Sequence, residues 1–197
     1  MVDYTSAPPL PNSYKKNKIT VNQHIFSLTN KNTITDENDT LIGFSKQKIF
    51  KIKDEINVYK SKDMKEEIFR IKQKNIVDVN ANFEIVDSMY DSTVGYLKKK
   101  PLESIGKNKY VFLGPGGEEI GETKISGSVG STVKSSLKGK WNYEVIYDDD
   151  IVASMKEKMT WTKYVFNIDF FSDLDYELDR RFPIAAALCI GGSKSNR

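Results

Sequence analysis

The stretch "DRRFPIAAALCIGG", residues 179–192, stands close to the C-terminal end of a polar, lysine-rich chain. Every side chain from Ile184 to Ile190 is apolar, so a helix formed here would be apolar all round and would need to be buried all round. Counted from Leu178, such a helix would be about 20 Å long, against roughly 30 Å of bilayer hydrocarbon. It is too short to span a membrane, and we predict that it is buried inside the protein.

The limits of this helix can be placed in two ways. Ser172 and Asp173 are candidate N-caps, and acidic residues after them would favour the positive end of a helix. Alternatively, Pro183 occupies the first turn of a shorter helix. Gly191 and Gly192 supply the stop. We predict a core helix over about residues 176–190.

The chain from about 18 to 170 alternates apolar and polar residues, which is typical of half-buried β-strands. The pattern is clearest in "NFEIVD" (82–87), "WNYEVIY" (141–147) and "KYVFNIDF" (163–170). Turn-forming residues separate the segments, so we expect antiparallel hairpins throughout. A curved sheet of many strands needs a filled interior, and the simplest arrangement is a barrel wrapped around the apolar helix.

A short pattern recurs at the start of four predicted strands: an aliphatic residue, a small residue, two variable positions and a lysine. Its four copies begin at Ile42-Gly43, Val94-Gly95, Ile120-Gly121 and Val152-Ala153. We expect the small residue to allow a close approach of neighbouring atoms or to mark a bend of the sheet.

The composition indicates one globular domain. The chain has 197 residues, of which 39% are hydrophobic and 29% charged, and a net charge of only +3. So small an excess does not indicate a nucleic-acid-binding protein. Cys189 is the single cysteine, which excludes an internal disulfide. No signal peptide or transmembrane run is recognised, so the expected location is cytoplasmic, with peripheral membrane association as an option.

We predict three parts along the chain: a flexible, proline-containing tail over residues 1–16, a barrel domain over 17–192 and a short polar tail over 193–197. Little of the first segment is expected to be buried, because three prolines favour an extended conformation. Its "PPLP" sequence could instead dock on a proline-recognition module.

Three stretches together resemble the tubby C-terminal-like superfamily, and in particular its LURP-one-related and phospholipid scramblase-like members. They are "ITVNQHIFSLTNKNTITDENDTLIGFSKQKIF" (19–50), "NFEIVDSMYDSTVGYLKKKPLESIGKNKYVFLGPGGEEIGETK" (82–124) and "FFSDLDYELDRRFPIAAALCIGG" (170–192). The resemblance implies a mainly β fold, a closed antiparallel barrel of about twelve strands around a central hydrophobic C-terminal helix. The longer hydrophobic end and the cysteine-rich segments of scramblases have no counterpart here.

Two sets of candidate site residues follow. A basic surface binds phosphoinositide head groups in tubby proteins, so we expect lipid head-group or partner contacts among Lys98, Lys99, Lys100, Lys46, Lys48, Lys51 and Lys53. Asp173, Asp175 and Asp179 match the scramblase stretch associated with calcium, although a helix start explains the same acids.

His24 is the only histidine, and we interpret it as a structural residue of a strand. Without a second histidine, the chain does not suggest a zinc site or a nucleophile–histidine pair. No catalytic constellation or cofactor motif is recognised, apart from the calcium option. An enzyme using acids such as Glu118 and Glu119 is the least favoured hypothesis.

The leading hypothesis is therefore a non-enzymatic binding module for an anionic membrane surface, phosphoinositide-like head groups or a protein partner. The alternatives are scramblase-like, calcium-responsive handling of phospholipids, or a structural scaffold with no ligand.

Overall fold

The structure is a computed structural model, and it describes residues 7–24, 29–48, 55–76, 81–102, 107–126 and 140–192. Within these ranges the chain forms a short 3₁₀ helix, a set of β-strands and one α-helix. The elements are η1 (Asn12–Tyr14), β1 (Lys18–His24), β2 (Thr29–Asp36), β3 (Leu41–Lys48), β4 (Glu55–Tyr59), β5 (Glu67–Ile76), β6 (Ala81–Asp87), β7 (Ser92–Leu102), β8 (Lys107–Leu113), β9 (Glu119–Ile125), β10 (Lys140–Tyr147), β11 (Asp150–Met159), β12 (Lys163–Phe170) and α2 (Arg181–Gly192).

The strands form one closed antiparallel barrel in which each strand pairs with its neighbours in the sequence, and β12 returns to pair with β1. The alternation read from the sequence sets the two faces. In β12, for example, Tyr164, Phe166, Ile168 and Phe170 are buried, while the residues between them are less so. The prediction of a mainly β, closed barrel is confirmed.

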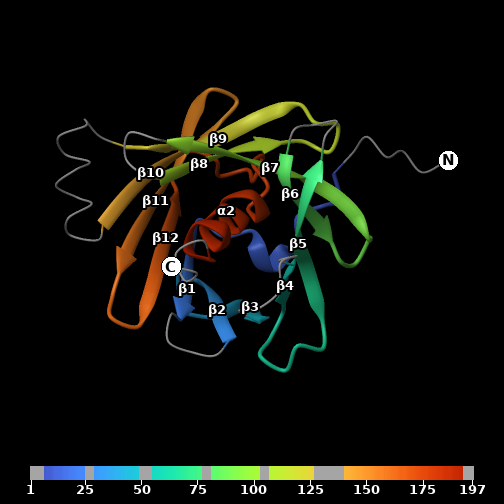
Figure 1. The fold of residues 1–197 in the computed structure, drawn as a ribbon, viewed down its shortest axis with the longest axis vertical. Coiled ribbons are helices and arrows are strands. Elements are labelled where there is room, and N and C mark those ends of the chain that lie inside the picture. Colours follow the sequence, from blue (N-terminus) through green and yellow to red (C-terminus); the bar gives the residue numbers. More distant parts are fainter. Residues whose placement is uncertain are drawn as a thin grey trace.

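Helix α2 lies inside the ring of strands (Figure 1). Ala185, Ala186 and Ala187 have no exposed surface, and Phe182 packs against Phe112 of β8 with ring centroids 5.4 Å apart. The helix begins at Arg181, later than the predicted residue 176, so Pro183 lies in its first turn. Its missing N–H costs no helical hydrogen bond there, because N–H groups of the first turn have no partner within the helix. No helix among the described residues is long and apolar enough to cross a membrane.

The recurring pattern at four strand starts coincides with four irregularities of the barrel. The pairing skips Ile42, Val94, Ile120 and Val152, each the residue directly before the small one. A β-bulge at these points bends and twists the strand. A Cβ atom added at Gly43 would lie 2.6 Å from the Tyr14 hydroxyl. The small residue therefore serves both expected purposes, a bend and a close approach.

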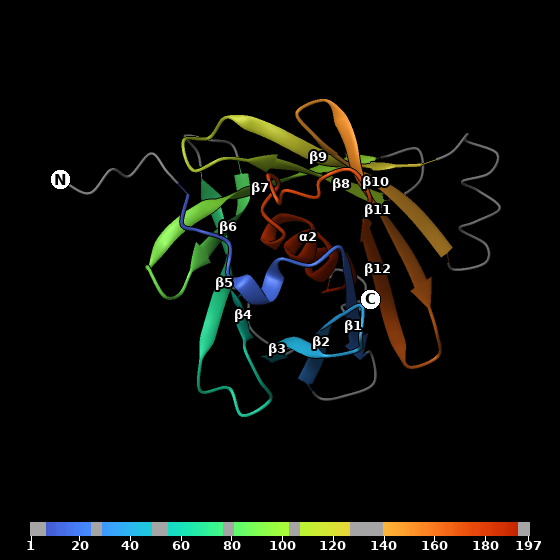
Figure 2. The same cartoon turned by 180° about the vertical axis from the view of Figure 1, so that it is seen from behind.

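Part of the segment predicted to be a loose tail is packed against the barrel. Pro8 is buried, and Tyr14 has no exposed surface and meets the Phe69 ring edge-on, with centroids 5.9 Å apart. Figure 2 shows this blue segment, with η1, crossing one end of the barrel beside α2. The prediction that little of residues 1–16 is buried is wrong for these two residues, because Tyr14 fills space that the strands leave open at that end.

Candidate functional site

A row of basic side chains crosses four adjacent strands on the outer face of the barrel. Lys163 of β12 stands opposite His24 of β1, and Lys31 of β2 stands opposite Lys46 of β3. The pairing of Gln23 with Asn32 continues in register to place His24 beside Lys31. Neighbouring strands are about 5 Å apart, so one face of the sheet presents these side chains in line. We call Lys163, His24, Lys31 and Lys46 the basic row.

The basic row borders a surface groove of about 660 Å³. The lining residues are His24, Lys31, Thr33, Phe44, Lys46, Lys62, Met64 and Thr162. Thr33 and Phe44 are opposite each other on β2 and β3, Lys62 and Met64 come from the β4–β5 turn, and Thr162 comes from the β11–β12 turn. The groove therefore combines a short apolar floor, two hydroxyl-bearing threonines and several cationic groups.

None of the described residues that line this groove is acidic. Within the described part of the chain, no carboxylate forms an ion pair with Lys31, Lys46 or Lys62. Partial burial lowers the pKa of His24, and the charges of Lys163 and Lys31 lower it further. Among the described residues, no carboxylate therefore neutralises the positive charge of these lysines.

A second cationic group, Arg180 and Arg181, is buried and paired with carboxylates, unlike the exposed lysines of the groove. Arg181, at the start of α2, is fully buried and donates hydrogen bonds to both oxygens of Asp179, one of them at 2.6 Å, and to Asp87 at the end of β6. It also donates to the backbone carbonyl of Pro8 at 2.8 Å. These contacts join the helix, the barrel wall and the N-terminal segment, and they satisfy the guanidinium in planar, bidentate geometry.

Arg180 is buried in the same manner. It pairs with Asp173, donates to the backbone carbonyl of Asp173 at 2.6 Å and lies 3.7 Å from the centroid of the Phe170 ring. Burial lowers the pKa of Arg180, and the Asp173 carboxylate opposes that change. Asp173 also accepts hydrogen bonds from the backbone N–H groups of Glu177 and Leu178, at 2.8 and 3.1 Å, so it fixes the turn that leads into α2.

Residues 17–191 match the LURP-one-related family. The chain belongs to this family. The tubby-like superfamily fits it at a coarser level, so the resemblance seen in the sequence is confirmed. A search of curated proteins finds no match.

In this LURP-one-related barrel, the three predicted calcium ligands do not gather around one point. Asp173 and Asp179 contact the buried arginines, and Asp175 is exposed. Among the residues that the structure describes, no group of three or more His, Cys, Asp or Glu side chains could hold a metal ion. Calcium binding here stays a prediction, and the cations that these carboxylates do contact are guanidinium groups.

The predicted lysine contacts are dispersed. Lys98, Lys99 and Lys100 are consecutive on β7, so Lys99 takes the opposite face from the other two. Of the predicted lysines whose side chains the structure describes, only Lys46 lines the groove. Lys48 ends β3, its side chain lies outside the described residues, and so do Lys51 and Lys53 entirely.

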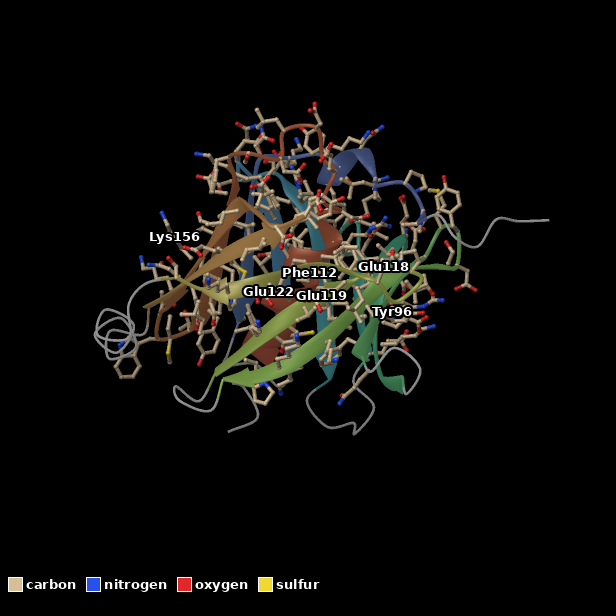
Figure 3. All side chains as sticks on the ribbon, turned by 90° about the horizontal axis from the view of Figure 1, so that it is seen from above. Tyr96, Phe112, Glu118, Glu119, Glu122 and Lys156 are labelled. Atoms are coloured by element: carbon tan, nitrogen blue, oxygen red, sulfur yellow. The ribbon has the colours of Figure 1, made fainter. Side chains whose placement is uncertain are left out.

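The acids considered for an enzyme lie on another side of the barrel. Figure 3 shows Glu118, Glu119 and Glu122 along the β8–β9 side of the barrel, at a distance from Lys156. A groove of about 570 Å³ there is lined by Glu119, Glu122, Asp148 and Asp149, together with Ile120, Gly121, Ile146 and Tyr147. Lys109 pairs with Glu122 at 2.6 Å, so part of this acidic charge is neutralised.

The sequence interpretation missed Lys31, Lys62 and Lys163 and assigned His24 to structure alone. One signal could have identified Lys31. Lys31 and Lys46 lie on the two strands of the predicted opening hairpin, and the correct strand register would have placed them opposite each other. Lys62 and Thr162 could not be added from sequence, because separate turns bring them to the groove.

Proposed function

We propose that this barrel is a non-enzymatic module that binds anionic head groups in the groove beside the basic row. The single observation that supports it most is the pairing of Lys31 with Lys46, which stand directly opposite each other in a groove whose described lining residues include no carboxylate. Like charges directly opposite on a sheet destabilise it. A phosphate-bearing ligand would remove this repulsion and gain charge-assisted hydrogen bonds from both lysines.

Further contacts fit the same ligand class. Lys62 reaches the groove from the β4–β5 turn, and Thr33 and Thr162 bring hydroxyl groups that donate to phosphate oxygens. His24 would become a donor on both ring nitrogens once protonated. Several donors spread over one face suit a head group that carries more than one phosphate.

The test is isothermal titration calorimetry with soluble inositol trisphosphate on the whole chain. Each lysine near an anionic group adds roughly 1 kcal/mol, so the double variant Lys31→Ala/Lys46→Ala should bind about 30-fold more weakly. Binding by the native protein should also weaken as salt is raised, because screening shortens the range of these charges.

The matched control is Lys124→Ala/Lys156→Ala, which removes two exposed lysines from β9 and β11 and none from the groove. It should bind like the native chain. Equal losses in both double variants would mean that only overall charge matters. No binding by the native protein at low salt would contradict the proposal and leave the scaffold hypothesis in its place.

A further inference from the structure

The turn between β11 and β12 presents an aromatic side chain to solvent. Trp161 is 91% exposed, the largest value among the exposed large hydrophobic residues described. The turn that carries it is held in place: the Thr160 N–H donates to the Lys163 carbonyl at 2.8 Å, and the Lys163 N–H donates to the Thr160 hydroxyl oxygen at 3.1 Å. The indole is therefore displayed on a fixed scaffold.

This turn is part of the groove described above. Thr162, the next residue, lines the groove, and Lys163, the one after it, belongs to the basic row. Met64, 39% exposed, lines the groove from the β4–β5 turn, and Met159, 51% exposed, ends β11 just before the turn. Exposed apolar side chains and unneutralised lysines thus occur on the same side of the barrel.

An exposed indole among lysines has the two properties that a bilayer surface recognises. Tryptophan concentrates at the interface between water and hydrocarbon, where its apolar ring is buried and its N–H still finds a partner. Lysines near it gain from the negative surface potential of anionic lipids. Neither signal alone anchors a protein, but an apolar insertion and a basic patch together do.

We propose that Trp161 inserts into the interface of an anionic bilayer, so that the groove receives its head group from the membrane surface. This inference rests on the proposed function for the nature of the ligand, and it adds the partner and the side of the barrel that faces it. The occupant is a lipid surface because the charge around Trp161 is positive and complements anionic lipid.

The test uses phosphatidylcholine vesicles with and without phosphatidylserine. The chain has two tryptophans, so Trp141→Phe leaves Trp161 as the only indole, whose emission is excited selectively over that of the tyrosines. Its emission should shift to the blue on anionic vesicles and should be quenched by lipids brominated on their acyl chains. Trp161→Ala should weaken vesicle binding by about tenfold or more. Unchanged emission, or vesicle binding by Trp161→Ala at the native level, would overturn the inference.

Two comparisons separate this inference from the proposed function. Tyr90→Ala, which removes an aromatic side chain 56% exposed in the β6–β7 turn, is the matched control and should bind vesicles normally. Trp161→Ala should still bind soluble inositol trisphosphate, whereas Lys31→Ala/Lys46→Ala should bind both inositol trisphosphate and anionic vesicles more weakly. Insertion of Trp161 without head-group binding would support the inference and contradict the proposed function. Head-group binding without insertion would do the reverse.

Discussion

The barrel carries two groups of cationic side chains that differ in how they are neutralised. Arg180 and Arg181 are buried, and Asp173, Asp179 and Asp87 accept their hydrogen bonds. The lysines of the groove are exposed, and the lining residues that the structure describes include no acid. The arginines need no ligand, because aspartates of the protein neutralise them. The described residues supply no such anion to the groove lysines, which fits an external anionic ligand.

This difference shows that the density of basic residues along a sequence is a poor guide to a binding surface. "DRR" places two arginines side by side, and both are used to hold the helix in the barrel. The basic row has members far apart in the sequence, brought together only by strand pairing.

A guanidinium placed in the core without a carboxylate should prevent folding. Ala186 is fully buried in α2, so Ala186→Arg would bury a charge that nothing nearby pairs with. We expect no folded protein by circular dichroism and one-dimensional NMR. Met159→Arg, at a site 51% exposed, introduces the same group and should fold. A native-like spectrum for Ala186→Arg would contradict the buried position of the helix.

Removing a buried arginine should cost more than removing an exposed lysine. Arg181→Ala leaves the Asp87 carboxylate buried without its partner, so the free energy of unfolding should fall by about 3–5 kcal/mol. Urea denaturation measures this. The comparison is Lys18→Ala, which breaks an exposed ion pair with Asp169 and should change stability by less than about 1 kcal/mol. Similar losses in the two variants would show that burial does not distinguish the cations.

Removing one lysine of the Lys31–Lys46 pair should not destabilise the protein, in contrast to the removal of Arg181. Lys31 and Lys46 repel each other across the strands, so Lys31→Ala in the free protein should leave stability unchanged or raise it by about 0.2–1 kcal/mol. Thermal unfolding at low salt is the measurement, and high salt should reduce the difference. A clear loss of stability would mean that Lys31 has a structural role that the ligand hypothesis does not include.

Much of the fold could be predicted from the sequence, because local patterns encode it. The alternation of β12 and the all-round apolar run from Ile184 led to a barrel with a filled centre, and both are present. The start of α2 was placed too early, since Asp173 caps a turn and Tyr176 has a positive φ of 63°, which interrupts the helical path.

The groove was harder to predict, because it depends on register and on turns that meet in space. Lys46 was named from its neighbours in the sequence, but Lys31 and Lys62 reach it from another strand and another turn. The buried arginines were missed for a similar reason. Asp87 contacts Arg181 across a sequence separation of 94 residues, and no local sequence pattern predicts such a pair.

His24 provides the most direct test of anion binding in the groove, because it is the only histidine of the sequence and it belongs to the basic row. Burial and the charges of Lys163 and Lys31 place its pKa below the ordinary 6.5 in the free protein. The unfolded chain then binds this proton more tightly than the folded chain does. The free energy of unfolding therefore decreases as the pH falls below about 6.5. A bound phosphate group would favour the protonated ring and raise the pKa.

The measurement is a proton NMR titration of the single imidazole signal, with and without saturating inositol trisphosphate. We expect a pKa below 6.5 in the free protein and a higher value in the complex, with affinity for inositol trisphosphate increasing as the pH falls through that range. An identical pKa in the two titrations, with the ligand shown to be bound, would place the anion elsewhere and contradict the assignment of the groove.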